Sequence, residues 1–123
     1  DETVRVWETA TGATVATVTG TADLSSVTFS SDGTRIVSGS SDGTVRVFNT
    51  ESGAEVSTLG GVAPVVTSVA TSPSGNLMVS GSSDETVRVY DAQTGEVVAT
   101  LTGHTSDVTS VTFSPDGTQV ISA

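Results

Sequence analysis

The sequence predicts an all-β fold, and three observations support that expectation. First, a segment of the form Asp-x-Thr-Val-Arg-Val-aromatic begins at Asp1, Asp42 and Asp84, at intervals of 41 and then 42 residues. Second, each copy alternates with a period of two, which is typical of a half-buried strand. Third, the 22 threonines and 21 valines are β-branched and favour strands, and no stretch keeps the 3.6-residue period of a helix.

Each repeat is expected to contain four short strands joined by turns. In the last repeat we predict them at 86–90, 97–101, 108–113 and 118–122. Ser114-Pro115-Asp116-Gly117 forms a turn between the last two, because proline presets φ and glycine accepts a positive φ. The first repeat is one residue shorter, between Gly20 and Val27, which marks a loop. Short strands with such turns indicate antiparallel hairpins.

Length and charge exclude several classes of function. The 123 residues suit one domain, and acidic residues outnumber arginines 14 to 4, with no lysine and a net charge of −10. Binding to phosphate backbones needs clustered basic residues, so we expect no nucleic acid and no membrane as partners. With no cysteine, disulfides and thiolate metal sites are excluded. We expect a soluble protein and leave the compartment open, with the cytoplasm favoured over secretion.

A period of about 40–45 residues with four strands is the signature of a propeller blade. The chain resembles WD-repeat (WD40-type) β-propellers over its whole length. The features that carry this resemblance recur in phase and are Gly103-His104, Ser114-Pro115-Asp116-Gly117, the Ser-Gly-Ser-Ser-Asp segments at 38–42 and 80–84, Trp7-Glu8 and Tyr90-Asp91. The resemblance implies propeller blades of four antiparallel strands, three blades per chain, which close only by oligomerisation.

The resemblance also sets the phase of the repeats. We treat 1–123 as a single repeat domain with repeats 1–41, 42–83 and 84–123. In the family the aromatic strand is the third of a blade, so the chain opens on a third strand and closes on a second. One blade would then be split, formed by 104–123 with 1–20 of a neighbouring chain. Propellers have about four to eight blades, so three cannot close alone.

Head-to-tail pairing of identical chains would satisfy both ends. A dimer would give six blades and is favoured over a trimer with nine, which lies outside the usual range. A competing interpretation is that the chain is an excerpt of a longer propeller. Natural and engineered origins both remain open.

In the family, a structural hydrogen-bonded tetrad joins a loop His, a Ser or Thr, an Asp and a Trp. The resemblance assigns it in the split blade to His104, Ser122, Asp1 and Trp7, which include the only His and the only Trp of the chain. The other two sets lack both the His and the indole, so we expect weaker tetrads at Thr21, Ser38, Asp42 and Phe48, and at Val62, Ser80, Asp84 and Tyr90.

Nothing in the sequence supports an enzyme, a cofactor or a metal site. Gly39-x-Ser41-x-Gly43 matches a hydrolase pattern, but it falls in a predicted hairpin turn and not before a helix. His104 with Asp107 could be drawn as part of a triad, yet the Gly-His loop explains this His better. The three equivalent arginines are expected to pair with nearby acids, with an anion-binding or partner-binding girdle as the alternative: Arg5, Arg46 and Arg88.

The most variable loops are the candidate partner-binding surface, because recognition usually resides in variable loops on a fixed scaffold. They contain Ala22 and Asp23, Val62, Ala63, Pro64 and Val65, and Thr105, Ser106 and Asp107. The leading hypothesis is a non-enzymatic scaffold for an unidentified protein or peptide, built as a homo-oligomeric ring. Alternatives are a designed or evolved self-assembling repeat protein, or a propeller fragment, with no ligand. Small-molecule or glycan binding in a central channel has little support from five aromatic residues.

Overall fold

The computed structural model describes residues 2–19, 22–59 and 64–123. These residues form twelve β-strands and no helix, and therefore no helix that could cross a membrane. The strands are β1 Thr3–Trp7, β2 Thr14–Thr19, β3 Leu24–Phe29, β4 Arg35–Ser40, β5 Val45–Asn49, β6 Glu55–Leu59, β7 Val66–Thr71, β8 Leu77–Ser82, β9 Val87–Asp91, β10 Val97–Leu101, β11 Val111–Phe113 and β12 Val120–Ser122.

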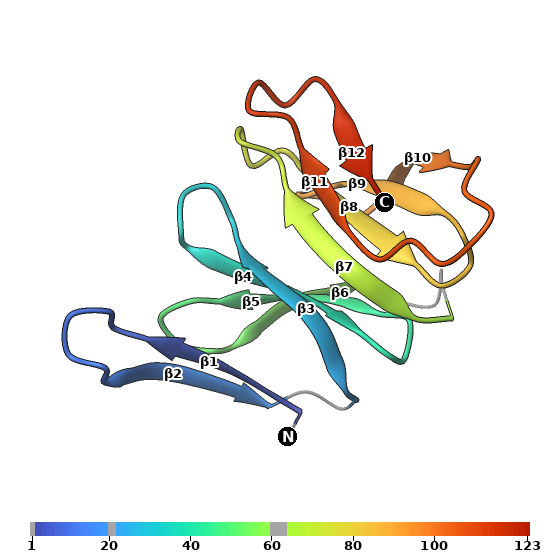
Figure 1. Ribbon diagram of the computed structural model, residues 1–123. Helices are drawn as coiled ribbons and strands as arrows, with labels where there is room; N and C mark the ends of the chain where they lie inside the picture. The colour runs from blue at the N-terminus through green and yellow to red at the C-terminus, as the bar shows by residue number, and fades with distance from the viewer. Residues whose placement is uncertain (1, 20–21, 60–63) are drawn as a thin grey trace.

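The strands form four antiparallel sheets in which sequential neighbours pair (Figure 1). Strands β3-β4-β5-β6 make the first blade, and β7-β8-β9-β10 make the second. Strands β1-β2 form a two-stranded N-terminal half-blade, and β11-β12 a C-terminal half-blade. The predicted all-β class and the four-stranded antiparallel blades are confirmed.

The C-terminal strands are shorter than the sequence predicts. The sequence predicts the last two strands of the repeat at 108–113 and 118–122, whereas β11 and β12 cover only Val111–Phe113 and Val120–Ser122. The equivalent strands β7 and β8 in the second blade have six residues each. In that blade β8 pairs with both β7 and β9, whereas β12 pairs only with β11, so fewer hydrogen bonds hold its ends extended.

The core lies between the blades. A cluster that includes Val37, Val47, Val69 and Tyr90 fills the first interface, between the first and second blades. The second interface, between the second blade and the C-terminal half-blade, is filled by a set of valines that includes Val79 and Val111. A third cluster joins the N-terminal half-blade to the first blade and consists of Val4, Val18, Ile36 and Phe48.

Repeated polar and steric contacts fix how one blade stacks on the next. The backbone N–H of Val69 donates to Ser26 Oγ at 3.2 Å, and that of Val111 donates to the equivalent Ser68 Oγ at 3.3 Å. The blades also pack tightly at a glycine of the second strand. A Cβ added at Gly39 would lie 2.4 Å from Val66 Cγ1, so the first interface leaves no room for alanine there.

Candidate functional site

One end of the blades carries the predicted partner-binding loops, and we call it the loop face. The backbone N–H of Ser41 donates to the carbonyl of Asp23 at 2.9 Å, and that of Ser83 donates to Val65 at 3.1 Å. These bonds bring the variable loops against the Ser-Ser-Asp turns. Of the predicted loop residues, Asp23, Pro64, Thr105, Ser106 and Asp107 are exposed, Ala22 and Val65 are half-buried, and Val62 and Ala63 lie outside the described residues.

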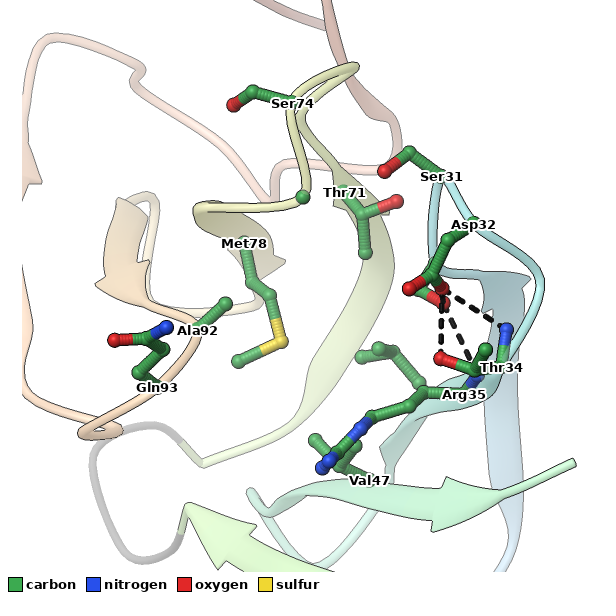
Figure 2. A pocket seen from close by; sticks show the side chains of 13 residues that line it. Ser31, Asp32, Thr34, Arg35, Val47, Thr71, Ser74, Met78, Ala92 and Gln93 are labelled. Atoms are coloured by element: carbon green, nitrogen blue, oxygen red, sulfur yellow. Dashed lines mark hydrogen bonds between the residues drawn. The ribbon is translucent and has the colours of Figure 1, made fainter.

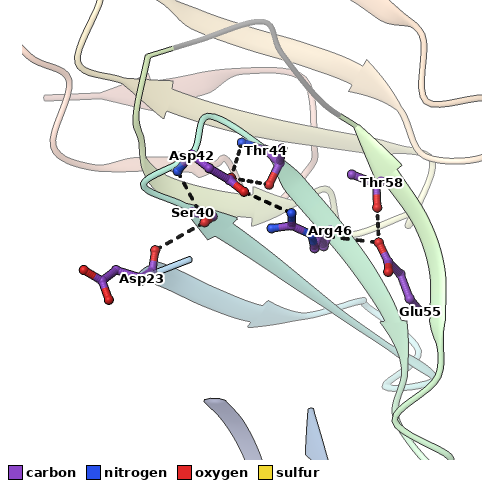
Figure 3. Close-up of polar contacts among 7 residues, drawn as sticks. All are labelled: Asp23, Ser40, Asp42, Thr44, Arg46, Glu55 and Thr58. Atoms are coloured by element: carbon purple, nitrogen blue, oxygen red, sulfur yellow. Dashed lines mark hydrogen bonds and ion pairs between the residues drawn. The ribbon is translucent and has the colours of Figure 1, made fainter. Parts of the chain in front are cut away.

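The repeated arginines pair with acids, as the repeat predicts, at the two positions where the structure shows the partner. Arg46 Nη2 lies 3.0 Å from Asp42 Oδ2, and Arg88 Nη2 lies 2.7 Å from Asp84 Oδ2. Figure 3 shows Arg46 between Asp42 and Glu55, with Glu55 Oε1 at 3.9 Å from Nε. These pairs use the arginines within the repeat, which disfavours the anion-binding girdle at both positions.

The same aspartates cap their own turns. Burial raises the pKa of Asp42, but hydrogen bonds from Thr44 and Arg46 outweigh it and lower the pKa to about 2. The bonds from Arg88 lower the pKa of Asp84 well below its usual range. Both carboxylates are therefore ionised at neutral pH and serve as structural acceptors.

The tetrad positions differ among the three repeats. His104 Nε2 lies 2.8 Å from Ser122 Oγ, so the C-terminal half-blade brings these two predicted members together. In the second blade, Ser80 Oγ donates to the Tyr90 hydroxyl at 3.2 Å in a buried site. Ser38 Oγ in the first blade is buried and has no hydrogen-bond partner among the described residues, because the phenyl ring of Phe48 offers none. Asp1, Thr21 and Val62 lie outside the described residues, so the complete tetrads stay predictions.

The three aromatic residues at the equivalent strand position have different environments. Phe48 is 3% exposed and Tyr90 is 1% exposed, whereas Trp7 is 55% exposed. The first two are covered because each lies in a whole blade that packs on the preceding sheet. In this structure Trp7 lies at the free face of the N-terminal half-blade.

Neither of the two catalytic patterns has catalytic geometry within the described residues. Gly39-x-Ser41-x-Gly43 spans the end of β4 and the turn into β5, with no helix after it. His104 contacts Ser122, but no hydrogen bond joins its ring to Asp107 in the described part of the chain. Within residues 2–19, 22–59 and 64–123, no group of three His, Cys, Asp or Glu side chains is placed to hold a metal ion.

The described residues also form a pocket that the repeat pattern did not single out. A pocket of about 430 Å³ lies between the first and second blades, at the strand ends opposite the loop face (Figure 2). Arg35 and Thr71 both line it. The other repeats carry Phe29 and Phe113 at the position of Thr71, and Leu77 and Gln119 at the position of Arg35. The missing aromatic ring at Thr71 was therefore the signal that the sequence offered.

Stacked four-stranded antiparallel blades at a 42-residue period define the class of protein as a repeat protein of the propeller kind. The family model described as WD domain, G-beta repeat (WD40) matches residues 12–49, 53–91 and 95–123. The chain therefore belongs to the WD40 repeat family, as the resemblance indicated. No curated protein matches the sequence.

Proposed function

We propose that the protein is a non-enzymatic scaffold for protein interactions, completed by head-to-tail assembly of copies of the chain. Its C-terminal half-blade would pair with the N-terminal half-blade of the next copy and form one whole blade. The observation that carries the proposal is the exposure of Trp7, at 55%, where the equivalent Phe48 and Tyr90 are buried. A four-stranded blade stacked on its neighbour is what covers this position elsewhere in the chain.

The whole blades predict the register of the joint. In the first blade, Ile36 of β4 lies opposite Phe48 of β5, and Val37 lies opposite Val47. Transferred by the repeat, this register pairs Val120 with Trp7 and Ile121 with Val6 of the next copy. Ile121 is 59% exposed in the single chain, so the joint would bury apolar surface from both partners.

Side-chain sizes at the expected joint are complementary. Each whole interface places a glycine against a valine, and a Cβ on Gly81 would lie 2.8 Å from Val108 Cγ1. The third set of these repeat positions holds Ala123 and Leu24. Leucine has one γ-carbon where valine has two, so Leu24 leaves more room near its Cβ for the methyl of Ala123. At this pair of positions alanine replaces the smaller glycine, and a leucine that is not branched at Cβ replaces valine. These matched changes support contact between β12 of one copy and β3 of the next.

The assembled ring would present several copies of the loop face to partners. Two chains would supply six blades and three would supply nine, and six lies within the usual range of about four to eight. Because loops on a rigid scaffold are common recognition surfaces, we place the protein or peptide partner on this face. The proposal includes no cofactor, no nucleic acid and no membrane.

Native mass spectrometry of the intact chain at several concentrations tests the assembly. We expect one closed species at twice the 12.3 kDa chain mass, or less favourably at three times that mass. A monomer, or a ladder of sizes without a closed end point, would contradict closure and favour a fragment of a longer propeller. A closed ring that retains no partner protein in pull-downs would instead favour assembly without a ligand.

Cysteine pairs test the register, because the chain has no native cysteine. The double variant Val6→Cys with Ile121→Cys should form disulfides between chains, since directly opposed strand residues have Cα atoms about 4.5–5.5 Å apart. The control, Val4→Cys with Ile121→Cys, displaces the pair by two residues and should crosslink much more slowly. Equal crosslinking of both pairs would contradict the proposed joint.

A further inference from the structure

The pocket between the first and second blades is built by both sheets. The first blade contributes Arg35, Val37 and Val47, and the second contributes Thr71 and Met78 (Figure 2). Val37, Val47 and Met78 are buried members of the apolar cluster at this interface, so they give the pocket an apolar floor. Its volume of about 430 Å³ falls in the range typical of sites for small ligands or single side chains.

The second interface shows why the first is hollow. There, Leu77 and Phe113 pack against the apolar cluster between the second blade and the C-terminal half-blade. The repeat places Arg35 and Thr71 at these two positions in the first interface. The Thr71 hydroxyl donates to the carbonyl of Phe29 at 2.9 Å, so this side chain is held against β3. The pocket therefore includes the positions that a leucine and a phenyl ring occupy one interface further along.

The charges in the pocket lie apart from one another. Arg46 and Arg88 have carboxylate partners, but no carboxylate of the described residues lies within ion-pair distance of Arg35. Figure 2 shows the Arg35 side chain extending past Val47, away from the carboxylate of Asp32. A guanidinium beside an apolar pocket floor is a strong binding site for a carboxylate, because it can donate two parallel hydrogen bonds to the carboxylate oxygens.

Asp32 places a negative charge in the pocket lining, away from the guanidinium of Arg35. Its Oδ1 accepts hydrogen bonds from the Thr34 N–H at 3.0 Å, the Ser30 hydroxyl at 2.7 Å and the Thr34 hydroxyl at 2.8 Å. These bonds, that of the Thr34 N–H most of all, lower the pKa of Asp32 to about 2 and keep it negative. An anionic ligand group is therefore repelled from Asp32 and directed toward Arg35.

We infer that this pocket binds a segment of a partner protein in which an aromatic residue is followed by an acidic one. The ring would occupy the volume that Phe113 fills in the second interface, and the carboxylate would bind Arg35. The net charge of −10 opposes an acidic ligand at long range, but screening over about 8 Å at physiological ionic strength leaves the local guanidinium dominant. The site is complete within one chain, so it goes beyond the proposed head-to-tail assembly and does not depend on it.

Blocked dipeptides test the two chemical requirements separately. The probes are acetyl-Phe-Glu-amide, acetyl-Phe-Gln-amide and acetyl-Ala-Glu-amide, titrated into the ¹⁵N-labelled intact chain and followed by NMR. We expect the first to bind in the millimolar range or tighter, with shifts around Arg35 and Thr71, and each of the others to bind about tenfold more weakly. Equal binding of all three, shifts confined to the loop face, or no shift at about 10 mM of the first probe would overturn the inference.

Variants that copy the residues of the second interface should close the pocket without unfolding the blades. Thr71→Phe and Arg35→Leu introduce the residues that the second interface already accommodates, so both should fold, and each should weaken binding of acetyl-Phe-Glu-amide at least tenfold. Gln119→Leu is the matched control, since it makes the same kind of change at the equivalent position of the C-terminal half-blade, and it should leave binding unchanged. Undiminished binding to Thr71→Phe would show that the ring does not enter this pocket. A monomeric chain would leave these expectations intact, so failure of assembly and failure of the pocket are distinguishable.

Discussion

The whole blades and the half-blades are built from the same repeat, yet equivalent residues do different things in them. Phe48 and Tyr90 are buried in whole blades, whereas Trp7 at the equivalent position of the N-terminal half-blade is 55% exposed. Ser80 bonds to Tyr90 within one blade, while Ser122 bonds to His104 at the end of the chain. A repeat of this kind is stabilised mainly by contacts with its nearest neighbours. Whether a neighbouring strand or sheet covers a residue therefore decides how much that residue contributes to stability.

The largest expected effect compares Phe48 with Trp7 in the single chain. Phe48→Ala removes a ring packed with Val4, Val18 and Ile36 and should cost about 3–5 kcal/mol of unfolding free energy. Trp7→Ala removes an exposed ring and should change the free energy of the dissociated chain by about 0.5 kcal/mol or less. Urea unfolding at concentrations low enough for the dissociated chain measures both.

For assembly of the oligomer, we expect the change at Trp7 to have a larger effect than a change at Phe48. Trp7→Ala and His104→Ala lie at the proposed joint and should raise the dissociation constant of the oligomer more than a change at Phe48 does. Phe48→Leu is the milder comparison for this measurement, because Phe48→Ala is expected to weaken the fold itself. Equal dissociation constants for the three variants, by analytical ultracentrifugation, would remove the distinction between joint and blade.

The next effect concerns the steric match between Ala123 and Leu24. Leu24→Val recreates the β-branched side chain of the equivalent Val66. In the first interface, a Cβ added at Gly39 would lie only 2.4 Å from Cγ1 of Val66. Overpacking of this kind costs about 1–3 kcal/mol, so the single variant should assemble more weakly. Adding Ala123→Gly should restore assembly, as a double-mutant cycle can measure. Additive effects of the two changes would show that these residues do not meet.

The sequence was sufficient for the order of the strands and for the hairpins, because the period-two pattern and the turn residues are local signals repeated three times. It also predicted that Arg46 pairs with a nearby acid, and the structure shows that this acid is Asp42, in the turn before the same strand. The pocket required the structure. Arg35 and Thr71 are 36 positions apart in sequence, and only the stacking of two blades shows that both line one interface, at positions where the second interface has apolar residues. The short lengths of β11 and β12 could not be predicted either, because strand length depends on pairing with a neighbouring strand, which a local sequence pattern does not show.

A smaller effect separates the two whole blades. Tyr90→Phe would leave the buried Ser80 hydroxyl without its partner and should cost about 1–2 kcal/mol. Ser38→Ala removes a buried hydroxyl that has no partner among the described residues, so it should be neutral or stabilise the fold by about 1 kcal/mol. Thermal unfolding of both variants at neutral pH tests the contrast. Destabilisation by Ser38→Ala equal to that by Tyr90→Phe would mean that the Ser38 hydroxyl is satisfied in solution.

The smallest effect is the acid dependence of the two turn aspartates. Folding lowers the pKa of Asp42 from 3.8 to about 2, and bonds from Arg88 lower the pKa of Asp84 further. A carboxylate whose pKa is lower in the folded state stabilises the fold above its unfolded pKa, and this stability is lost as the pH falls through the folded value. The unfolding free energy should therefore be level near neutral pH and decline from about pH 4 toward pH 2.

Arg88 donates to Asp84 twice, at 2.7 and 3.4 Å, whereas one such bond from Arg46 to Asp42 is seen, at 3.0 Å. Asp84→Asn should accordingly flatten the acid decline more than Asp42→Asn, measured by urea unfolding at a series of pH values, and the opposite order would show that the second guanidinium bond contributes nothing.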